Sequence, residues 1–124
     1  MDVEKHIRYW QNSSDEDWRA AMSLLDEGHY RHGLFFIHLS IEKKLKAAYV
    51  GTTAAPAPRS HDLQRLARES GLAIDEKRAV NLARLNRYCM EGRYPDDWAV
   101  SITKAEAAEI TAVAEELAQW LTNR

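Results

Sequence analysis

The most regularly patterned stretch of this chain, residues 29–50, reads HYRHGLFFIHLSIEKKLKAAYV. Its apolar side chains recur every three or four positions, a spacing that places them on one face of an α-helix. They are Tyr30, Leu34, Ile37, Ile41, Leu45 and Ala48, and Phe35, Phe36 and Leu39 widen the stripe. So wide an apolar surface predicts a central helix that touches several neighbours or a second copy of the protein. Glu42 and Lys46 are expected on its exposed remainder, as a favourable i,i+4 pair.

Helical periodicity also precedes this stretch. Val3 to Trp10 form a short apolar stripe, and a second stripe follows until Gly28, which is suited to ending a helix. The chain between them either continues as helix or bends at Asn12 to Ser14, where Ser14 could cap a new start.

The region after the central helix begins with a loop. Residues 51–59 contain two prolines and a glycine, which break helical continuity. Ser60 is then a plausible N-cap for a short helix that ends at Gly71, and Asp75 can cap another helix that runs to about Glu91.

The last helix carries a capping box. Thr103 and Glu106 stand three positions apart, ahead of a further apolar stripe. No segment alternates apolar and polar residues long enough to predict a strand. We therefore expect an all-α fold, an up-and-down four-helix bundle with an additional short helix, formed by a single domain of residues 1–124.

Composition narrows the class of protein. The chain is 45% hydrophobic and 29% charged, which favours a folded domain over a disordered one. Neither a membrane span nor a secretory signal is visible, and the lone Cys89 agrees with a reducing compartment, so a cytoplasmic location is expected. A net charge of −2 argues against non-specific duplex binding, although a local arginine cluster can still hold one nucleotide.

Candidate binding residues gather at the end of the helix that follows Asp75. Asn86 falls on the apolar stripe, so its amide needs polar partners, and the nearest suppliers in sequence are Arg84, Arg87 and Arg93. Arginine offers planar donors to phosphate, and the neighbouring Tyr88 and Tyr94 offer rings on which a base can stack. The alternative is structural: Arg87 pairs with Glu91, the tyrosines fill gaps in the core, and residues 93–96 form a rigid turn.

Other polar groups point less clearly to a site. His29 and His32 are only two potential metal ligands, so no metal and no cofactor is expected. Ser60, His61 and Asp62 are adjacent and therefore point in different directions, which disfavours a catalytic triad. The free N–H groups at this helix start, next to Arg59, either receive a phosphate or are capped in the ordinary way.

Several short phrases of the sequence occur in a familiar order and spacing. They are Tyr9-Trp10, Asp17 to Leu25, Gly28-His29-Tyr30, Ile41 to Ala47, Ser60 to Leu63 with Leu66, Leu85-Asn86 with Tyr88, and Arg93-Tyr94-Pro95-Asp96. Together they resemble the HEPN domain family, and the resemblance covers about residues 3–121. The resemblance implies a helical bundle that pairs as a homodimer and is often encoded beside a small nucleotidyltransferase, as in toxin-antitoxin pairs.

The sequence departs from the family's ribonuclease motif. That motif is an arginine followed four to six residues later by a histidine, and no histidine occurs after His61. The first hypothesis is therefore a domain that binds a nucleotide or RNA phosphate without this motif. Its site would use Arg87, Arg93, Tyr88 and Tyr94, ordered by Asn86 and Asp96.

Two other functions remain open. One is an interaction protein, the helical partner subunit of a minimal nucleotidyltransferase. The other is a divergent ribonuclease in which Arg87 or Arg93 holds the phosphate and a distant histidine such as His61 acts as the base.

Overall fold

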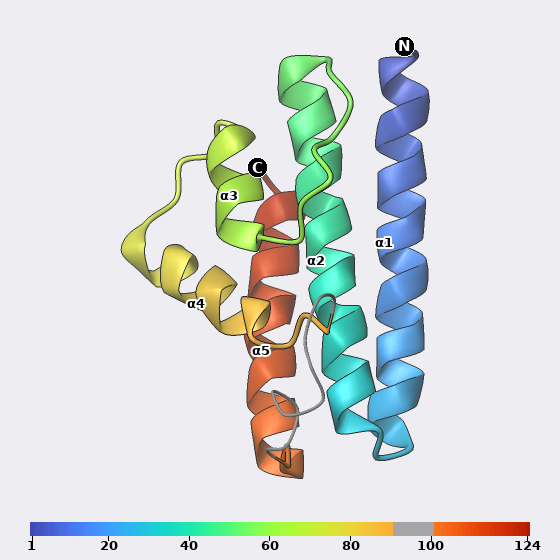
Figure 1. The fold of residues 1–124 in the computed structure, drawn as a ribbon, viewed down its shortest axis with the longest axis vertical. Helices are drawn as coiled ribbons and strands as arrows, with labels where there is room; N and C mark the ends of the chain where they lie inside the picture. Colours follow the sequence, from blue (N-terminus) through green and yellow to red (C-terminus); the bar gives the residue numbers. More distant parts are fainter. Residues whose placement is uncertain (91–100) are drawn as a thin grey trace.

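The structure is a computed structural model that describes residues 1–90 and 101–124. Within those ranges all regular structure is helical, with the elements α1 (Val3–Asp26), α2 (Tyr30–Thr53), α3 (Leu63–Glu69), α4 (Glu76–Asn86) and α5 (Lys104–Thr122). Helices α1, α2 and α5 are long and stand side by side, while α3 and α4 cover one face of α2 and α5 (Figure 1). The expected all-α bundle is confirmed, and the seven-residue α3 is its additional short helix.

Helix α1 is continuous, which confirms the first of the two alternatives and rules out a bend at residues 12–14. Ser14 lies inside the helix and is fully buried against α2 rather than capping a new start. Its Oγ donates to the carbonyl oxygen of Ser40 at 2.7 Å, and Ser40 Oγ donates back to the carbonyl oxygen of Ser14 at 2.9 Å. Beside them, Lys43 forms an ion pair with Asp17 at 2.7 Å. The polar residues that suggested a break in the helix therefore bind α1 to α2.

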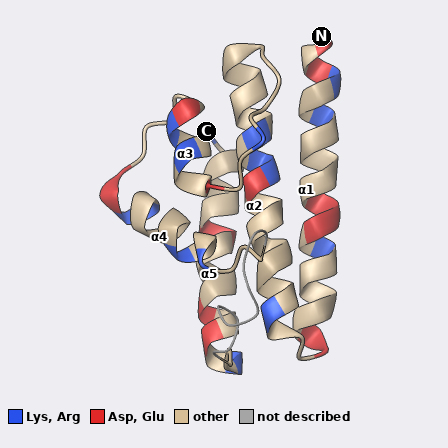
Figure 2. Ribbon diagram, in the orientation of Figure 1, with Lys and Arg blue, Asp and Glu red and all other residues tan. Residues whose placement is uncertain are grey.

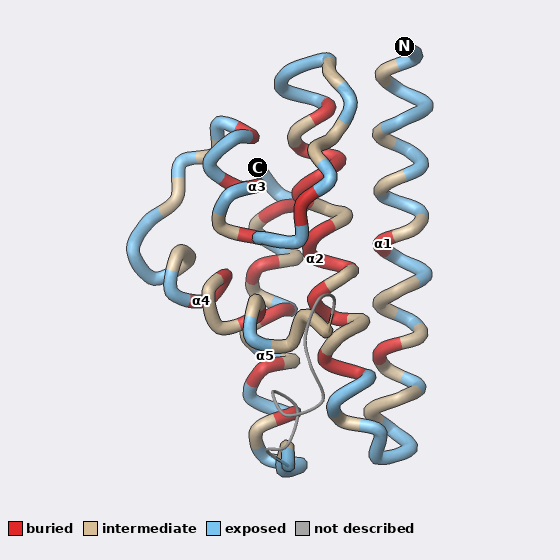
Figure 3. The backbone as a smooth tube through the Cα atoms, in the orientation of Figure 1, coloured by how far each residue is buried: buried red, intermediate tan, exposed pale blue. Residues whose placement is uncertain are grey.

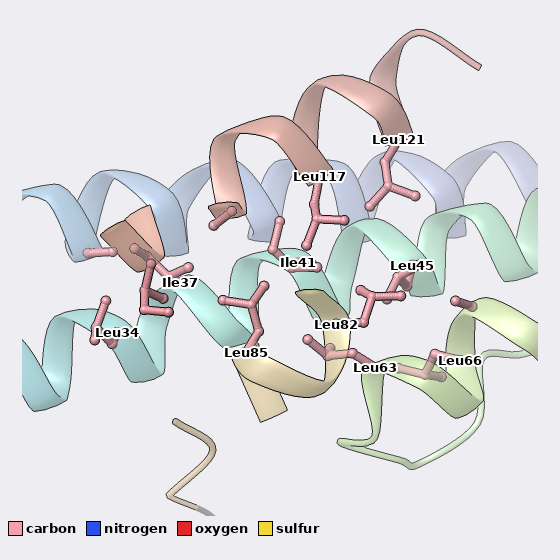
Figure 4. Close-up of a cluster of buried hydrophobic side chains, with 14 of the residues drawn as sticks. Leu34, Ile37, Ile41, Leu45, Leu63, Leu66, Leu82, Leu85, Leu117 and Leu121 are labelled. Atoms are coloured by element: carbon pink, nitrogen blue, oxygen red, sulfur yellow. The ribbon is translucent and has the colours of Figure 1, made fainter. Parts of the chain in front are cut away.

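Helix α2 is central, as its wide apolar surface predicts. It packs against α1, α3, α4 and α5, and its buried residues recur from Gly33 to Val50, whereas α1 is largely exposed (Figure 3). The core around α2 draws leucines and isoleucines from α2, α3, α4 and α5 (Figure 4). Its largest fully buried apolar side chains are Leu34, Ile37, Ile41, Leu45, Val50, Leu63, Leu66, Leu82, Leu85 and Leu117.

The caps of α3 and α4 correct two boundaries. Asp62, not Ser60, caps α3, because its Oδ1 accepts from the backbone nitrogens of Gln64 and Arg65. Ser60 Oγ instead accepts from the backbone nitrogen of Asp62 at 3.1 Å. Helix α4 starts after its expected cap Asp75 but ends at Asn86, five positions short of the expected boundary at residue 91, which lies outside the described residues.

Two glycines end helices as expected. Gly28 and Gly71 have φ angles of +84° and +74°, in the left-handed region that residues with a Cβ rarely adopt. At the start of α5, Thr103 accepts from the backbone nitrogen of Glu106 at 3.1 Å, which confirms that half of the capping box.

Ion pairs hold α4 on α5. Arg84 donates to Glu109 at 2.7 Å, and Arg78 reaches Glu116 at 3.4 Å while its guanidinium stacks 4.8 Å from the ring of Trp120. The side chains of Arg78 and Arg84 therefore help to pack α4 on α5. Among the described residues, no helix is both long enough and apolar enough to cross a membrane.

Candidate functional site

A buried charged cluster lies in the middle of α2. Glu42 and Lys46 are 3% and 7% exposed, so the expectation that they form a surface pair was wrong. Lys46 Nζ donates to Glu42 Oε2 at 3.0 Å and sits 5.1 Å from the ring centre of Trp10 on α1. Apart from its first turn, the charged positions of α2 gather at this level of the bundle (Figure 2). Charges at this depth persist because each has a partner.

The second oxygen of Glu42 holds a histidine that comes from the start of α3. His61 Nδ1 donates to Glu42 Oε1 at 2.8 Å, and the His61 side chain is 49% exposed although the carboxylate beneath it is buried. A carboxylate only accepts hydrogen bonds, so the ring carries a proton on Nδ1. Within the described part of the chain, Nε2 of His61 has no hydrogen-bond partner.

His38 completes the cluster one helical turn before Glu42. It is fully buried, and its Nε2 donates to the carbonyl oxygen of His61 at 3.0 Å. Its Nδ1 lies 4.0 Å from Glu42 Oε1, beyond hydrogen-bond distance. Desolvation by burial lowers the pKa of His38 below its ordinary value of 6.5, although the nearby carboxylate partly offsets this. A neutral His38 therefore holds the backbone of His61 in place through its Nε2.

Asn86 joins the end of α4 to the start of α3. Its Oδ1 accepts from the backbone nitrogen of Leu63 at 3.0 Å, and its Nδ2 donates to Asp62 Oδ1 at 3.1 Å. The expectation that Asn86 needs polar partners is correct. Two of these partners lie at the start of α3. The bonds place the residue after Asn86, which is Arg87, beside the segment that carries His61.

Arg87 and Tyr88, which follow Asn86, differ in the bonds that their side chains form. Arg87 is exposed, and it forms no ion pair with any residue in the ranges that the structure describes. The hydroxyl of Tyr88 donates to Glu106 Oε2 at 2.7 Å. Burial, with help from that carboxylate, raises the pKa of Tyr88 to about 12. Arg87 is thus available to a ligand, whereas the Tyr88 hydroxyl is held by α5.

The remaining predicted site residues follow residue 90. Arg93, Tyr94 and Asp96 lie outside the described residues, as does Glu91, the alternative partner of Arg87. Across the described ranges, no three His, Cys, Asp or Glu side chains are grouped in a way that could hold a metal ion.

Hollows lie on another face, between α1 and α5. One of about 680 Å³ is bordered by Gln11 and Asp15 of α1, Lys44 of α2 and Thr122 of α5. A second, of about 420 Å³, lies between Met22 and Tyr30 on one side and Ala108 on the other. Both α1 and α5 pack on α2, and these hollows mark a groove between the two outer helices.

Comparisons with known proteins agree with the architecture. The family model described as the HEPN domain matches residues 7–124, nearly the whole chain. The chain belongs to the HEPN domain family. Among solved structures, this HEPN domain is similar to TT1696 from Thermus thermophilus, with a TM-score of 0.80 and 20% sequence identity over 94% of this chain and 96% of that one. At that identity the likeness supports the fold alone. No curated protein matches the chain.

The buried partnership of His61 with Glu42 is the feature that sequence reasoning missed. One signal was present: His38, Glu42 and Lys46 recur every four positions on a helix whose other faces are apolar. Polar residues at that spacing form their own stripe. On a helix packed from several sides, such a stripe faces a neighbour rather than solvent.

Proposed function

We propose that this HEPN domain binds the phosphate groups of a nucleotide or RNA at the end of α4. In this proposal Arg87 and Arg93 contact phosphate, Tyr88 and Tyr94 shape the pocket, and Asn86 and Asp96 order it. The family's ribonuclease motif, an arginine followed four to six residues later by a histidine, is absent from the sequence. The proposal is therefore one of binding and includes no RNA cleavage.

One observation carries the proposal. Arg87 is exposed and unpaired within the described ranges, whereas Arg84 and Arg78 on the same helix are bound to carboxylates of α5. The hydrogen bond between Asn86 and Asp62 brings Arg87 next to the segment of the half-exposed His61. The guanidinium of Arg87 supplies planar donors suited to phosphate oxygens.

Binding is tested by fluorescence anisotropy with labelled GTP, labelled ATP and a short single-stranded RNA. The variant in which Arg87→Ala and Arg93→Ala are combined should lose affinity by about tenfold to a hundredfold, since charge-assisted hydrogen bonds contribute roughly 1.5–3 kcal/mol each. Arg19→Ala, at an exposed position of α1, is the matched control and should bind like the unaltered protein.

Circular dichroism keeps this test interpretable, because the double variant must retain its helical signal and melting temperature. A folded double variant with unchanged affinity would overturn the site. Absence of binding by the unaltered protein to all three probes would overturn the function.

A second candidate function is favoured by α1. This helix packs on α2 alone among the substantial helix contacts, and its Tyr9 is 61% exposed next to Trp10. We propose that the face between α1 and α5 pairs with a second copy of the chain, so that the domain is a homodimer. A nucleotidyltransferase subunit, as in a toxin-antitoxin pair, is the alternative occupant of this face.

Sedimentation velocity of the purified chain distinguishes these occupants. A dimer that dissociates in Tyr9→Glu, but not in Glu27→Lys at the exposed end of α1, supports self-pairing. A monomer that is recovered from its host together with a nucleotidyltransferase supports the partner subunit instead. Cell fractionation of the host, carried out before that recovery, tests the proposed cytoplasmic location.

The divergent ribonuclease is the third function. It would use Arg87 or Arg93 as the phosphate clamp and His61 as the base. Incubation of nuclease-free protein with a fluorophore-quencher RNA tests it, and an uncut RNA after long incubation would remove it.

A further inference from the structure

The cluster around Glu42 does more than fill the core, because it presents one imidazole nitrogen to solvent in a fixed orientation. The carboxylate of Glu42 is buried and accepts from His61 Nδ1 at 2.8 Å. Holding Nδ1 in this way fixes the tautomer and leaves a lone pair on Nε2. In the neutral form of the ring, this lone pair, with a carboxylate behind the ring, is equipped to accept a proton.

His61 is held at both its ring and its backbone. His38 donates to its carbonyl oxygen at 3.0 Å, and the next residue, Asp62, caps α3 and accepts from Asn86. An imidazole whose ring and backbone are both bonded to α2, and whose next residue is bonded to Asn86, needs little rearrangement before it reacts.

Lys46 balances the charge of the cluster. Its ammonium group donates to the second oxygen of Glu42 at 3.0 Å and is covered by the ring of Trp10. This ion pair offsets the cost of burying both charges. When Nε2 takes up a proton, the imidazolium that forms lies directly against this carboxylate, which stabilises it.

The neighbouring groups decide which phosphate bond suits this arrangement. Cleavage of a phosphodiester expels an alkoxide, which needs a proton from a second group. In the part of the chain that the structure describes, Tyr88 does not fill that role, since its hydroxyl is bound to Glu106 and its pKa is raised to about 12. Hydrolysis of a terminal phosphoanhydride expels a nucleoside diphosphate instead, which leaves without a proton. One base and one nearby cation, Arg87, are sufficient for that bond.

We infer that Glu42 and His61 form a proton-transfer pair that hydrolyses the terminal phosphoanhydride bond of a nucleoside triphosphate, an inference that rests on the nucleotide site proposed above. His61 Nε2 takes a proton from water, and the water oxygen forms a bond to the terminal phosphorus. The bond from that phosphorus to the bridging oxygen breaks, and its electron pair leaves with the nucleoside diphosphate. The imidazolium then returns its proton to solvent.

The test measures binding and phosphate release separately, with the full chain and the magnesium complexes of ATP and GTP. His61→Asn keeps an amide nitrogen where Nδ1 donates to Glu42 but removes the base. It should lower kcat by about a hundredfold or more, in the range typical of general bases, and leave KM nearly unchanged. His32→Asn, at an exposed position of α2, is the matched control and should keep full activity.

Glu42 is a positioning residue, and its test is whether its substitution changes kcat without changing KM. Glu42→Gln should lower kcat while KM stays the same, and Glu42→Asp should restore part of the rate because it retains the carboxylate. A structural role alone would instead reduce the amount of folded protein and leave kcat per folded molecule unchanged, which would overturn the assignment of Glu42.

The remaining outcomes separate this inference from the proposed binding function. Nucleotide binding without phosphate release by the unaltered protein overturns the inference and leaves binding standing. Equal phosphate release by His61→Asn also overturns it. Cleavage of an RNA dinucleotide in place of the triphosphates, lost in His61→Asn, overturns the choice of bond. Absence of any nucleotide binding removes both proposals together.

Discussion

His61 Nδ1 donates to Glu42 Oε1 across 2.8 Å, although the two residues are 19 positions apart and only one of them is exposed. The bond links the start of α3 to the middle of α2. It also places Glu42 at the base of the candidate site, although the sequence of α2 alone suggests that this residue lies on the surface.

Removing the charge of Glu42 should be costly. Glu42→Gln leaves the buried Lys46 without its anion, so the free energy of unfolding should fall by about 3 kcal/mol or more. Lys46→Met should cost a similar amount, and the double variant should cost less than the sum of the two, with a coupling of about 1–3 kcal/mol. Urea denaturation of the four proteins measures this cycle.

The exposed pair Arg65 and Glu69 is the matched control for that cycle. These residues have the same i,i+4 spacing and the same 3.0 Å distance, but solvent screens them. Their coupling should be about 0.5 kcal/mol or less. If both pairs give equally small couplings, the account of a buried charged cluster is wrong.

His38 should make stability depend on pH. Burial lowers its folded-state pKa below 6.5, so the folded protein keeps it neutral while the unfolded chain takes up a proton near that value. The unfolded state then binds more protons, and the free energy of unfolding should fall as the pH drops from about 7.5 to about 5.5. The loss should approach roughly 1.4 kcal/mol for each unit by which the pKa is lowered.

His38→Gln isolates this contribution, since its amide nitrogen can still donate to the carbonyl oxygen of His61 but does not titrate. Urea denaturation over the same pH range should show a flatter dependence than in the unaltered protein and in His32→Gln. An identical slope in all three proteins would show that the pKa of His38 is the same in the folded and unfolded states, which would contradict this account.

Two glycines of α2 should respond in opposite directions to alanine. A Cβ at Gly33 would lie 2.7 Å from Cγ and Cδ2 of Leu25, so α1 and α2 would have to separate. Gly33→Ala should therefore destabilise the protein by about 1–3 kcal/mol despite the better helix propensity of alanine. At Gly51 the nearest atom, Cδ1 of Ile7, is 3.7 Å away.

Gly51→Ala should accordingly stabilise the protein by roughly 0.5–1 kcal/mol. Thermal unfolding of the two variants checks the pair, and a stabilising Gly33→Ala would mean that α1 and α2 are not so closely packed.

Much of the fold could be predicted because it depends on local signals. The stripe from Tyr30 to Ala48 identifies the central helix, and Gly28 and Thr103 mark ends that the structure confirms. These residues act within one turn of their own position, through periodicity, a left-handed φ angle or a capped N–H group. Such effects are visible in a single sequence.

Most of the failures share a cause that is not local. Ser14 and Ser40 satisfy one another across two helices, and Ser60 yields the cap of α3 to Asp62. The burial of Glu42 depends on a histidine that arrives from beyond a loop. The serine pair and the burial of Glu42 were decided by partners distant in sequence, which composition and spacing do not specify. The cap of α3 was instead a choice between two neighbouring residues that can both cap a helix.

The candidate site was predicted in part. Asn86 was identified correctly as an amide in need of partners, and Arg87 remains free within the described ranges. His61 had been considered only as a distant base, because nothing in its immediate sequence reveals the carboxylate beneath it. The roles of Arg93, Tyr94 and Asp96 stay predictions.

Ring-nitrogen NMR of His61 would show whether nucleotide phosphate binds beside Arg87 and His61. Titration of nitrogen-15-labelled protein with the magnesium complex of GTP should shift the Nε2 resonance of His61 in a saturable way. It should leave the ring of the exposed His32 unchanged, and Arg87→Ala should weaken the response. Saturable GTP binding that leaves the His61 ring unaffected, or that shifts His32 instead, would contradict the proposed site.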